Sequence, residues 1–194
     1  KMNTNQSRRD FIRTSGLAGS GLLLGLTFSA NSKSPAVVNA TLAEAGAIEF
    51  NPWIKILPSG KVILLNHKAE MGQGAFQVVP HILAEELEVD LKDIEIQFAP
   101  GDPKYGGQIT GGSSTVRGAY QHLLRLGATA RQMLISAAAE KWNVPASSCY
   151  AENSFVIHKP TGRKEGFGAL AESAGKQPVP LQVTLDRKST RLNS

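Results

Sequence analysis

Cysteine is almost absent from this chain, since Cys149 is the only one among 194 residues. A lone cysteine excludes an internal disulfide, and it also excludes a zinc or iron–sulfur site built on several cysteines. The four histidines are dispersed, and no two of them form an H-x-x-x-H pair. An autonomous metal site is therefore not expected, and no metal ligand is assigned.

The chain also lacks the common nucleotide-binding motifs. Gly111-Gly112-Ser113-Ser114-Thr115 is rich in glycine and hydroxyl groups, but it has neither the lysine of a P-loop nor the G-x-G-x-x-G spacing. No repeat of solenoid length is visible either. These absences argue against a P-loop enzyme, a dinucleotide-dependent dehydrogenase and a repeat protein.

The body of the chain lacks an excess of positive charge. The net charge is +5, but residues 1–33 contribute +4 and residues 186–194 contribute +2, which leaves about −1 for residues 34–185. The basic character therefore belongs to the two ends. Because a basic body is the usual electrostatic signature of a nucleic-acid-binding protein, no nucleic-acid partner is expected.

The N-terminal end has the layout of a targeting segment. Arg8-Arg9 and Phe11 precede a mildly apolar, glycine-rich stretch over residues 16–28, as in a signal with a basic region followed by a short apolar one. The paired arginines resemble twin-arginine signals, and the stretch is shorter than the roughly 20 apolar residues of a spanning helix. Residues 1–33 are predicted to be a twin-arginine signal region, recognised by the twin-arginine translocase. The predicted location is the periplasm or the outer face of a bacterial cytoplasmic membrane; cleavage of the signal and retention as an anchor are both left open.

Two further segments are set apart by composition. Residues 34–49 are small, polar and alanine-rich, which is typical of a linker. Residues 186–194 have no hydrophobic period and resemble the translation of a sequencing adapter, so they are predicted to be a non-native tail. The folded part is expected to cover residues 50–185.

Within that part the apolar pattern alternates between short strands and helices. A hairpin is predicted around the turn Pro58-Ser59-Gly60. Apolar spacings of three and four predict two main helices, and Pro80 either lies in the first turn of its helix or bends it. The fold class is α+β, with a hairpin and a small mixed sheet packed with two main helices. The predicted elements are strands 53–57, 61–65 and 94–98, helices 76–88 and 116–142, a hairpin from 155–157 across a turn at 161–163, a helix over 168–174 and an extended run over 179–185.

Glycine-rich segments precede both main helices. In Glu70-Met71-Gly72-Gln73-Gly74 the glycines permit close approach of a ligand, and Gln73 offers donors and an acceptor. Free amides at the start of the next helix are expected to face an anion or a polar cofactor edge. In the second segment, 111–115, hydroxyls and amides suit a phosphate or a polar heterocycle. From the residues alone, a tight turn explains the glycine-rich segments as well as ligand binding does. Simple helix capping explains the hydroxyl groups of the second segment equally well.

The order of these features is more specific than either loop. The run from His67 to Leu87, the strand ending before Pro100 and the loop ending in Gly112-Ser113-Ser114-Thr115 resemble the molybdopterin-binding part of the xanthine oxidase family large subunit. With the twin-arginine leader, the chain is similar to the beta subunit of the isoquinoline 1-oxidoreductase type. The resemblance covers residues 50–175 and implies an incomplete, N-terminal portion of a larger molybdopterin-binding subunit.

The resemblance implies binding roles for seven residues. The general base of this family is a glutamate near the end of the whole subunit, so no catalytic residue is expected in this chain. Glu70 is instead expected to be a hydrogen-bond partner for its own loop. The residues expected to bind the molybdenum–pterin cofactor are Gly72, Gln73 and Gly74 in the first loop, and Gly112, Ser113, Ser114 and Thr115 in the second.

The implied activity belongs to the whole subunit. It would oxidise N-heterocyclic aromatic compounds or aldehydes, with water as the oxygen source, on a molybdenum–molybdopterin cofactor in its cytosine dinucleotide form. Iron–sulfur clusters would lie on a small partner subunit, and a cytochrome is a possible electron acceptor. The 194-residue chain alone is expected to be inactive. The alternative from another class is a non-catalytic exported binding or assembly module.

Overall fold

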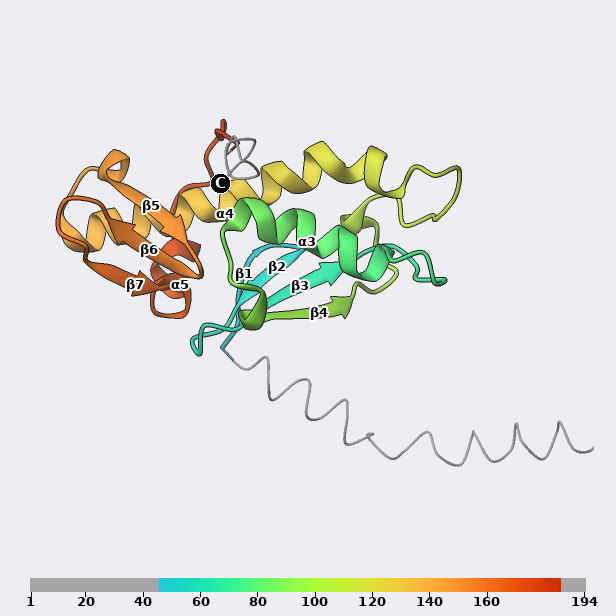
Figure 1. The fold of residues 1–194 in the computed structure, drawn as a ribbon, viewed down its shortest axis with the longest axis horizontal. Coiled ribbons are helices and arrows are strands. Elements are labelled where there is room, and N and C mark those ends of the chain that lie inside the picture. Colours follow the sequence, from blue (N-terminus) through green and yellow to red (C-terminus); the bar gives the residue numbers. More distant parts are fainter. Residues whose placement is uncertain (1–45, 186–194) are drawn as a thin grey trace, which may run out of the picture. The chain divides into compact units, whose positions relative to one another are not determined.

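The computed structural model describes residues 46–185 (Figure 1). The predictions for the signal region 1–33, for most of the linker and for the tail 186–194 therefore lie outside the described residues. Among the described helices, none is long and apolar enough to cross a membrane.

The first sheet has four strands in the order β1-β2-β3-β4. β1 pairs with β2 and β2 with β3 in antiparallel fashion, whereas β3 and β4 are parallel. The predicted hairpin is thus confirmed as β2 and β3, closed by a hydrogen bond from the Leu57 amide to the Lys61 carbonyl (2.9 Å). The predicted small mixed sheet is also confirmed. Its strands are β1 Ile48–Asn51, β2 Ile54–Ile56, β3 Val62–Asn66 and β4 Ile94–Phe98.

β1 was not predicted, and it begins inside the segment interpreted as a linker. The strand has four residues and its register with β2 shifts between Glu49 and Asn51. Two apolar residues in this span, Ile48 and Phe50, alternate too briefly to be read as a strand from sequence. Folded structure therefore starts slightly earlier than Phe50.

A β–α–β crossover links the parallel strands. The helix of this unit is α3 (Ala75–Leu87), close to the predicted span of 76–88. Pro80 lies in its second turn, not the first, and is buried. β3 is buried at every position because β2 and β4 flank it and α3 packs against it. Parallel strands require such a crossover, which the chain supplies with the predicted helix.

The second main helix, α4 (Thr115–Trp142), packs along α3, as Figure 1 shows. Its buried stripe is made of small and aliphatic side chains, including Leu123, Ala130, Leu134 and Ala138. The helix ends at Asn143, whose left-handed conformation (φ 54°) terminates it.

A second, three-stranded antiparallel sheet follows α4, in the order β5-β6-β7. The predicted hairpin across residues 161–163 is confirmed as β6 and β7. β5 was missed because the turn that joins it to β6 is Asn153-Ser154, which adopts positive φ at both residues (49° and 67°) without the glycine usual in such turns. The bounds are β5 Cys149–Glu152, β6 Phe155–His158 and β7 Lys164–Gly166.

The short helix α5 (Phe167–Gly175) confirms the helix predicted near 168–174 and packs against α4. The predicted extended run over 179–185 forms no strand in the described chain. Residues 46–185 also include three short 3-10 turns, at Leu91–Asp93, Pro103–Tyr105 and Ala146–Ser148. The α+β class is therefore confirmed.

Candidate cofactor-binding site

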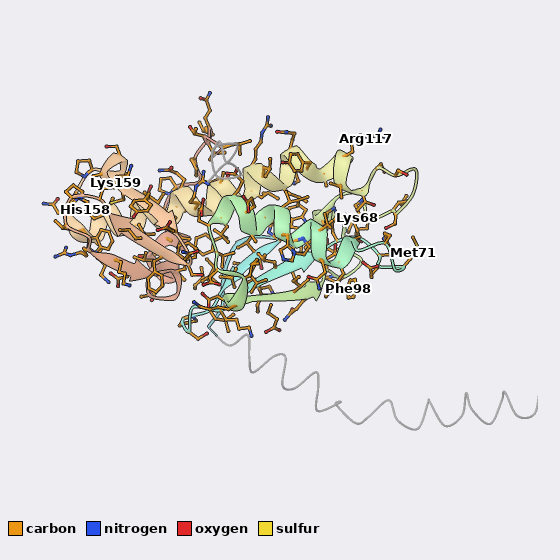
Figure 2. The ribbon with its side chains drawn as sticks, viewed as in Figure 1. Lys68, Met71, Phe98, Arg117, His158 and Lys159 are labelled. Carbon is orange, nitrogen blue, oxygen red and sulfur yellow. The ribbon has the colours of Figure 1, made fainter. Side chains whose placement is uncertain are left out.

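The two glycine-rich loops lie at one edge of the first sheet. Residues 67–74 follow β3 and residues 99–114 follow β4, and the parallel pairing of these strands places both loops at their common C-terminal edge. The Ala99 amide donates to the Asn66 carbonyl (2.8 Å). Figure 2 labels Lys68 in the first loop. Its Nζ donates to the carbonyls of Gly107 and Ile109 and so connects the two loops.

The first loop is organised around the Glu70 carboxylate. Its Oε2 accepts from the Phe76 amide (2.8 Å), and its Oε1 accepts from the amides of Gly74 (3.1 Å) and Gly72 (2.6 Å). These bonds hold the pKa of Glu70 below its ordinary value, with the Phe76 amide as the largest contribution. Gly72 and Gly74 have positive φ (89° and 83°), so successive amides turn inward toward one anion.

The expected role of Glu70 as a hydrogen-bond partner of the loop is confirmed. The expectation of free amides at the start of α3 is wrong for Gly72, Gly74 and Phe76, because the chain's own carboxylate occupies them. A carboxylate two residues before Gly72 is close enough to fold back into the concave backbone that the glycines form.

Gln73 also makes its hydrogen bonds within the loop. Its Oε1 accepts from the Met71 amide (2.5 Å) and its Nε2 donates to the Ala69 carbonyl (2.7 Å). The Met71 side chain beside it is 71% exposed. Cofactor binding by Gln73 stays a prediction, and it requires Gln73 to exchange these internal bonds for bonds to the ligand.

The second loop ends at α4 without the capping expected of its hydroxyl groups. Ser114 occupies the N-cap position in the αR region (φ −99°, ψ −7°), not in the extended region that a capping residue adopts. Its Oγ donates to the Gly111 carbonyl (2.9 Å) instead. No side chain of the described chain caps α4. The capping interpretation was therefore wrong, and the first-turn amides of α4 lack that partner.

A crevice of about 560 Å³ opens at the start of α4. We call it the α4 crevice. Of the seven residues predicted to bind the cofactor, Ser114 and Thr115 line it, whereas Gly112 and Ser113 of the second loop do not, nor do the three residues of the first loop. Its other lining residues are Trp53, His67, Lys68, Pro103, Lys104, Tyr105, Gly106, Gly107, Gly118, Ala119 and His122.

Sequence reasoning missed the aromatic wall of this crevice. The Trp53 ring makes edge-on contacts with His122 (5.2 Å between ring centroids), Tyr105 (5.7 Å) and His67 (6.0 Å). Burial, together with smaller contributions from the nearby Lys68 and His122, lowers the pKa of His67 to about 4. The imidazole is therefore neutral at pH 7. One signal was available, since His67 directly follows the strand that leads into the first loop.

The depressed pKa of His67 predicts an acid-dependent loss of stability. As pH falls below 6.5, the unfolded chain takes up a proton at this histidine, whereas the folded chain resists until about pH 4. Between pH 7 and pH 5 this linkage lowers the free energy of unfolding by about 2 kcal/mol. In the His67→Gln variant, which cannot titrate at this position, the free energy of unfolding should fall by about 2 kcal/mol less than in wild type between pH 7 and pH 5, as measured by urea unfolding. Equal falls in wild type and variant would contradict a lowered pKa at His67.

The open backbone of both loops fits a bulky polar cofactor. A Cβ placed on Gly72, Gly74 or Gly112 would meet no atom within 4 Å, and all three residues have positive φ. Gly111 to Arg117 contains no acidic side chain. A planar group can therefore approach all three backbones without steric conflict, and the second loop presents no negative side chain to it.

Comparison with known proteins decides the family. The model of the molybdopterin cofactor-binding domain matches residues 8–190. The chain belongs to this family. The expectation drawn from the loops is thereby confirmed at the level of the cofactor-binding domain.

Two curated relatives resemble the chain along part of their length. Isoquinoline 1-oxidoreductase subunit beta of Brevundimonas diminuta is 32% identical over 134 residues, which cover 66% of this chain and 17% of the relative. Membrane-bound aldehyde dehydrogenase [pyrroloquinoline-quinone] of Gluconacetobacter polyoxogenes is 29% identical over 164 residues, covering 84% and 21%. The chain thus spans about a fifth of the length of these relatives.

Solved structures show the same fold at lower identity. Quinoline 2-oxidoreductase of Pseudomonas putida 86 aligns with a TM-score of 0.51 and 22% identity over 68% of this chain and 17% of its own. Reconstituted CO dehydrogenase of Oligotropha carboxidovorans aligns with a TM-score of 0.53 and 24% identity, with the same coverage. The same α+β arrangement therefore occurs as a part of these two larger chains.

Proposed function

We propose that this chain is the N-terminal part of a molybdenum hydroxylase large subunit. The whole subunit oxidises N-heterocyclic aromatic compounds or aldehydes, with water as the oxygen source. Membership of the molybdopterin cofactor-binding family carries this proposal. The names of the relatives support the two substrate classes, because one refers to isoquinoline and the other to an aldehyde.

The residues of this chain have holding and positioning roles in the proposed function. Gly72, Gln73 and Gly74 would contact the cofactor from the first loop, and residues 112–115 from the second. Glu70 holds the conformation of the first loop because its carboxylate accepts hydrogen bonds from three backbone amides. When bound, the molybdenum cofactor supplies the oxidation–reduction chemistry, as cofactors do in general, and the protein supplies orientation and hydrogen bonds.

The finer features of the enzyme are part of the same proposal. The cofactor would be the cytosine dinucleotide form, and a small partner subunit would carry the iron–sulfur clusters, since this chain has one cysteine. A cytochrome would accept the electrons. The twin-arginine signal would export the subunit with its cofactor already inserted, to the periplasm or the outer face of the cytoplasmic membrane.

Metal and cofactor analysis of the complete subunit tests the proposal. We expect molybdenum and pterin after co-expression with the cofactor assembly machinery. Pyrroloquinoline quinone is measured in the same samples because a relative is named for it. Molybdenum and pterin both missing from correctly folded protein would refute the proposal and favour the alternative, a non-catalytic exported binding or assembly module.

Gln73→Ala in the complete subunit should reduce its molybdenum and pterin content. One lost hydrogen bond to a polar or charged group costs about 1–3 kcal/mol, which corresponds to weaker retention by roughly one to two orders of magnitude. Folding should change little, because Gln73 is exposed. The matched control is Gln132→Ala, an exposed glutamine in the middle of α4. Equal cofactor content in the two variants would remove Gln73 from the site.

A further inference from the structure

A groove of about 300 Å³ lies on the surface between α3 and α4. Ile82 and Leu124 form its floor and are each 9% exposed, whereas Val78 and Tyr120 form its sides and are 43% and 44% exposed. Val78 and Ile82 are four residues apart on α3, and Tyr120 and Leu124 are four apart on α4, so each pair lies on one side of its helix. We call this feature the α3–α4 groove; its remaining lining residues are Gln77, His81 and Glu85.

The apolar surface continues beyond the α3–α4 groove. Val116, one turn before Tyr120, is also exposed (40%) and extends the row on α4 to three residues. His81 Nδ1 donates to the Gln77 carbonyl of its own helix, so this polar group of the lining is used within α3. Single exposed apolar residues are common, but a group contributed by two packed helices is typical of a surface that contacts another part of a protein.

The end of the described chain lies along the same helices. Arg131 Nη2 donates to the Thr184 carbonyl, and Leu185 packs against the core; in Figure 1 this red end lies beside α4. Arg131 follows Leu124 by seven residues, which is close to two turns, so both lie on nearly the same side of α4, about 10 Å apart. About three extended residues cover that distance. The stretch that follows Leu185 therefore starts close to one end of the α3–α4 groove.

We propose that the α3–α4 groove is the docking site for the stretch of the complete subunit that directly follows Leu185. This inference rests on the proposed function, because it requires a longer subunit; the matched stretches are 17% and 21% of the two curated relatives. The docked stretch places aliphatic side chains against Val78 and Tyr120. From Arg131 back to Val116 the groove side of α4 is about 22 Å long, which about seven extended or 15 helical residues cross.

Thiol labelling of Val78→Cys tests whether the groove is covered. The variant is made in the 194-residue chain and in the complete subunit, and peptide mass spectrometry separates its signal from that of Cys149, which is buried. We expect a maleimide to react at least about tenfold more slowly in the complete subunit, because the thiol is accessible only when the docked stretch opens. Equal rates in the two proteins would show an open groove and overturn the proposal.

Photo-cross-linking identifies what covers the groove. A benzophenone amino acid in place of Tyr120 in the complete subunit should cross-link to residues within about 20 positions after Leu185, the length needed to cross the groove as a helix. The matched control carries the same amino acid in place of Arg125, an exposed residue of α4 that does not line the groove. This control should give no cross-link to that stretch.

A charged residue in the groove tests the apolar contact. Val78→Asp should lower the yield of the Tyr120-position cross-link at least about tenfold, because docking would bury an unpaired carboxylate. Gln121→Asp makes a charge change at an exposed position outside the lining and should leave the yield within about twofold. In the 194-residue chain, Val78→Asp should shift the melting temperature by less than about 2 °C, since the residue is exposed there.

Each other occupant of the groove gives a distinct cross-link. A cross-link to a second copy, to the small partner subunit or to a remote part of the subunit would overturn the proposal, and so would the absence of any cross-link to the stretch after Leu185. None of these measurements requires molybdenum. A subunit that lacks molybdenum and pterin but protects Val78→Cys and gives the expected cross-link would refute the proposed chemistry and support the docking; a molybdenum-containing subunit with an open groove would do the reverse.

Discussion

Gly127→Ala is expected to lower the free energy of unfolding by about 3 kcal/mol, because α3 and α4 cross too closely there for a side chain. A Cβ on Gly127 would lie 2.5 Å from the Leu83 carbonyl oxygen, 3.0 Å from Glu86 Cβ and 3.3 Å from the Leu87 amide nitrogen. Two of these neighbours are backbone atoms of a helix, which cannot swing aside as a side chain can. The two helices would have to separate, and packing along their contact would weaken.

The control for this prediction is on the same helix. A Cβ on Gly118 of α4 would meet nothing within 4 Å. Gly118→Ala should therefore show only the better helix propensity of alanine and raise the free energy of unfolding by up to about 1 kcal/mol. Urea unfolding of both variants measures the difference. If Gly127→Ala were as stable as Gly118→Ala, the close crossing of α3 and α4 would be wrong.

The sequence was sufficient for those elements whose apolar pattern is long. α3 and α4 were predicted almost to the residue, because 13 and 28 residues give several turns of a helical period. β1 and β5 were missed because each has four residues, and neither has a strong turn signal beside it. The internal hydrogen bonds of Gln73 and the unused cap at Ser114 depend on the backbone angles of two loops, which residue types alone do not determine.

For the candidate site, too, the sequence predicted one part and not another. The glycine pattern identified both loops, and the parallel pairing of β3 with β4 explains why they share one edge. The crevice between them could not be predicted, because Trp53, His67, Tyr105 and His122 are scattered over about 70 residues and meet only after folding. Their types are also those of ordinary core residues. Of these four, Trp53 and His67 each have a buried nitrogen without a hydrogen-bond partner, which is a property of the folded chain and not of the residue types.

Arg131 connects the core helices to the end of the described chain. Its Nη1 donates to the Glu86 carbonyl (2.7 Å) and to Glu86 Oε2 (3.0 Å), and its Nη2 donates to the Thr184 carbonyl (2.9 Å). The side chains of Arg131 and Glu86 are 13% and 4% exposed. A buried carboxylate and guanidinium in this arrangement depend strongly on each other, since water can replace neither partner well.

Arg131→Met is therefore expected to lower the free energy of unfolding by about 3 kcal/mol, the usual scale for removing one member of a buried ion pair. Met fills similar space, so the loss reports on charge and hydrogen bonds. Arg125→Met on the same helix removes an exposed arginine and should change stability by less than about 0.5 kcal/mol. Urea unfolding compares the two variants.

A second substitution separates the charge of the pair from the packing of α4. If the buried Glu86 carboxylate causes the loss, Glu86→Gln added to Arg131→Met should recover part of it, because the amide carries no charge. Hydrogen exchange should also rise over residues 176–185 in Arg131→Met, since the Nη2 bond to Thr184 is gone. An Arg131→Met chain as stable as Arg125→Met, with unchanged exchange in that segment, would contradict the role of Arg131 as the link between α3, α4 and the residues that follow α5.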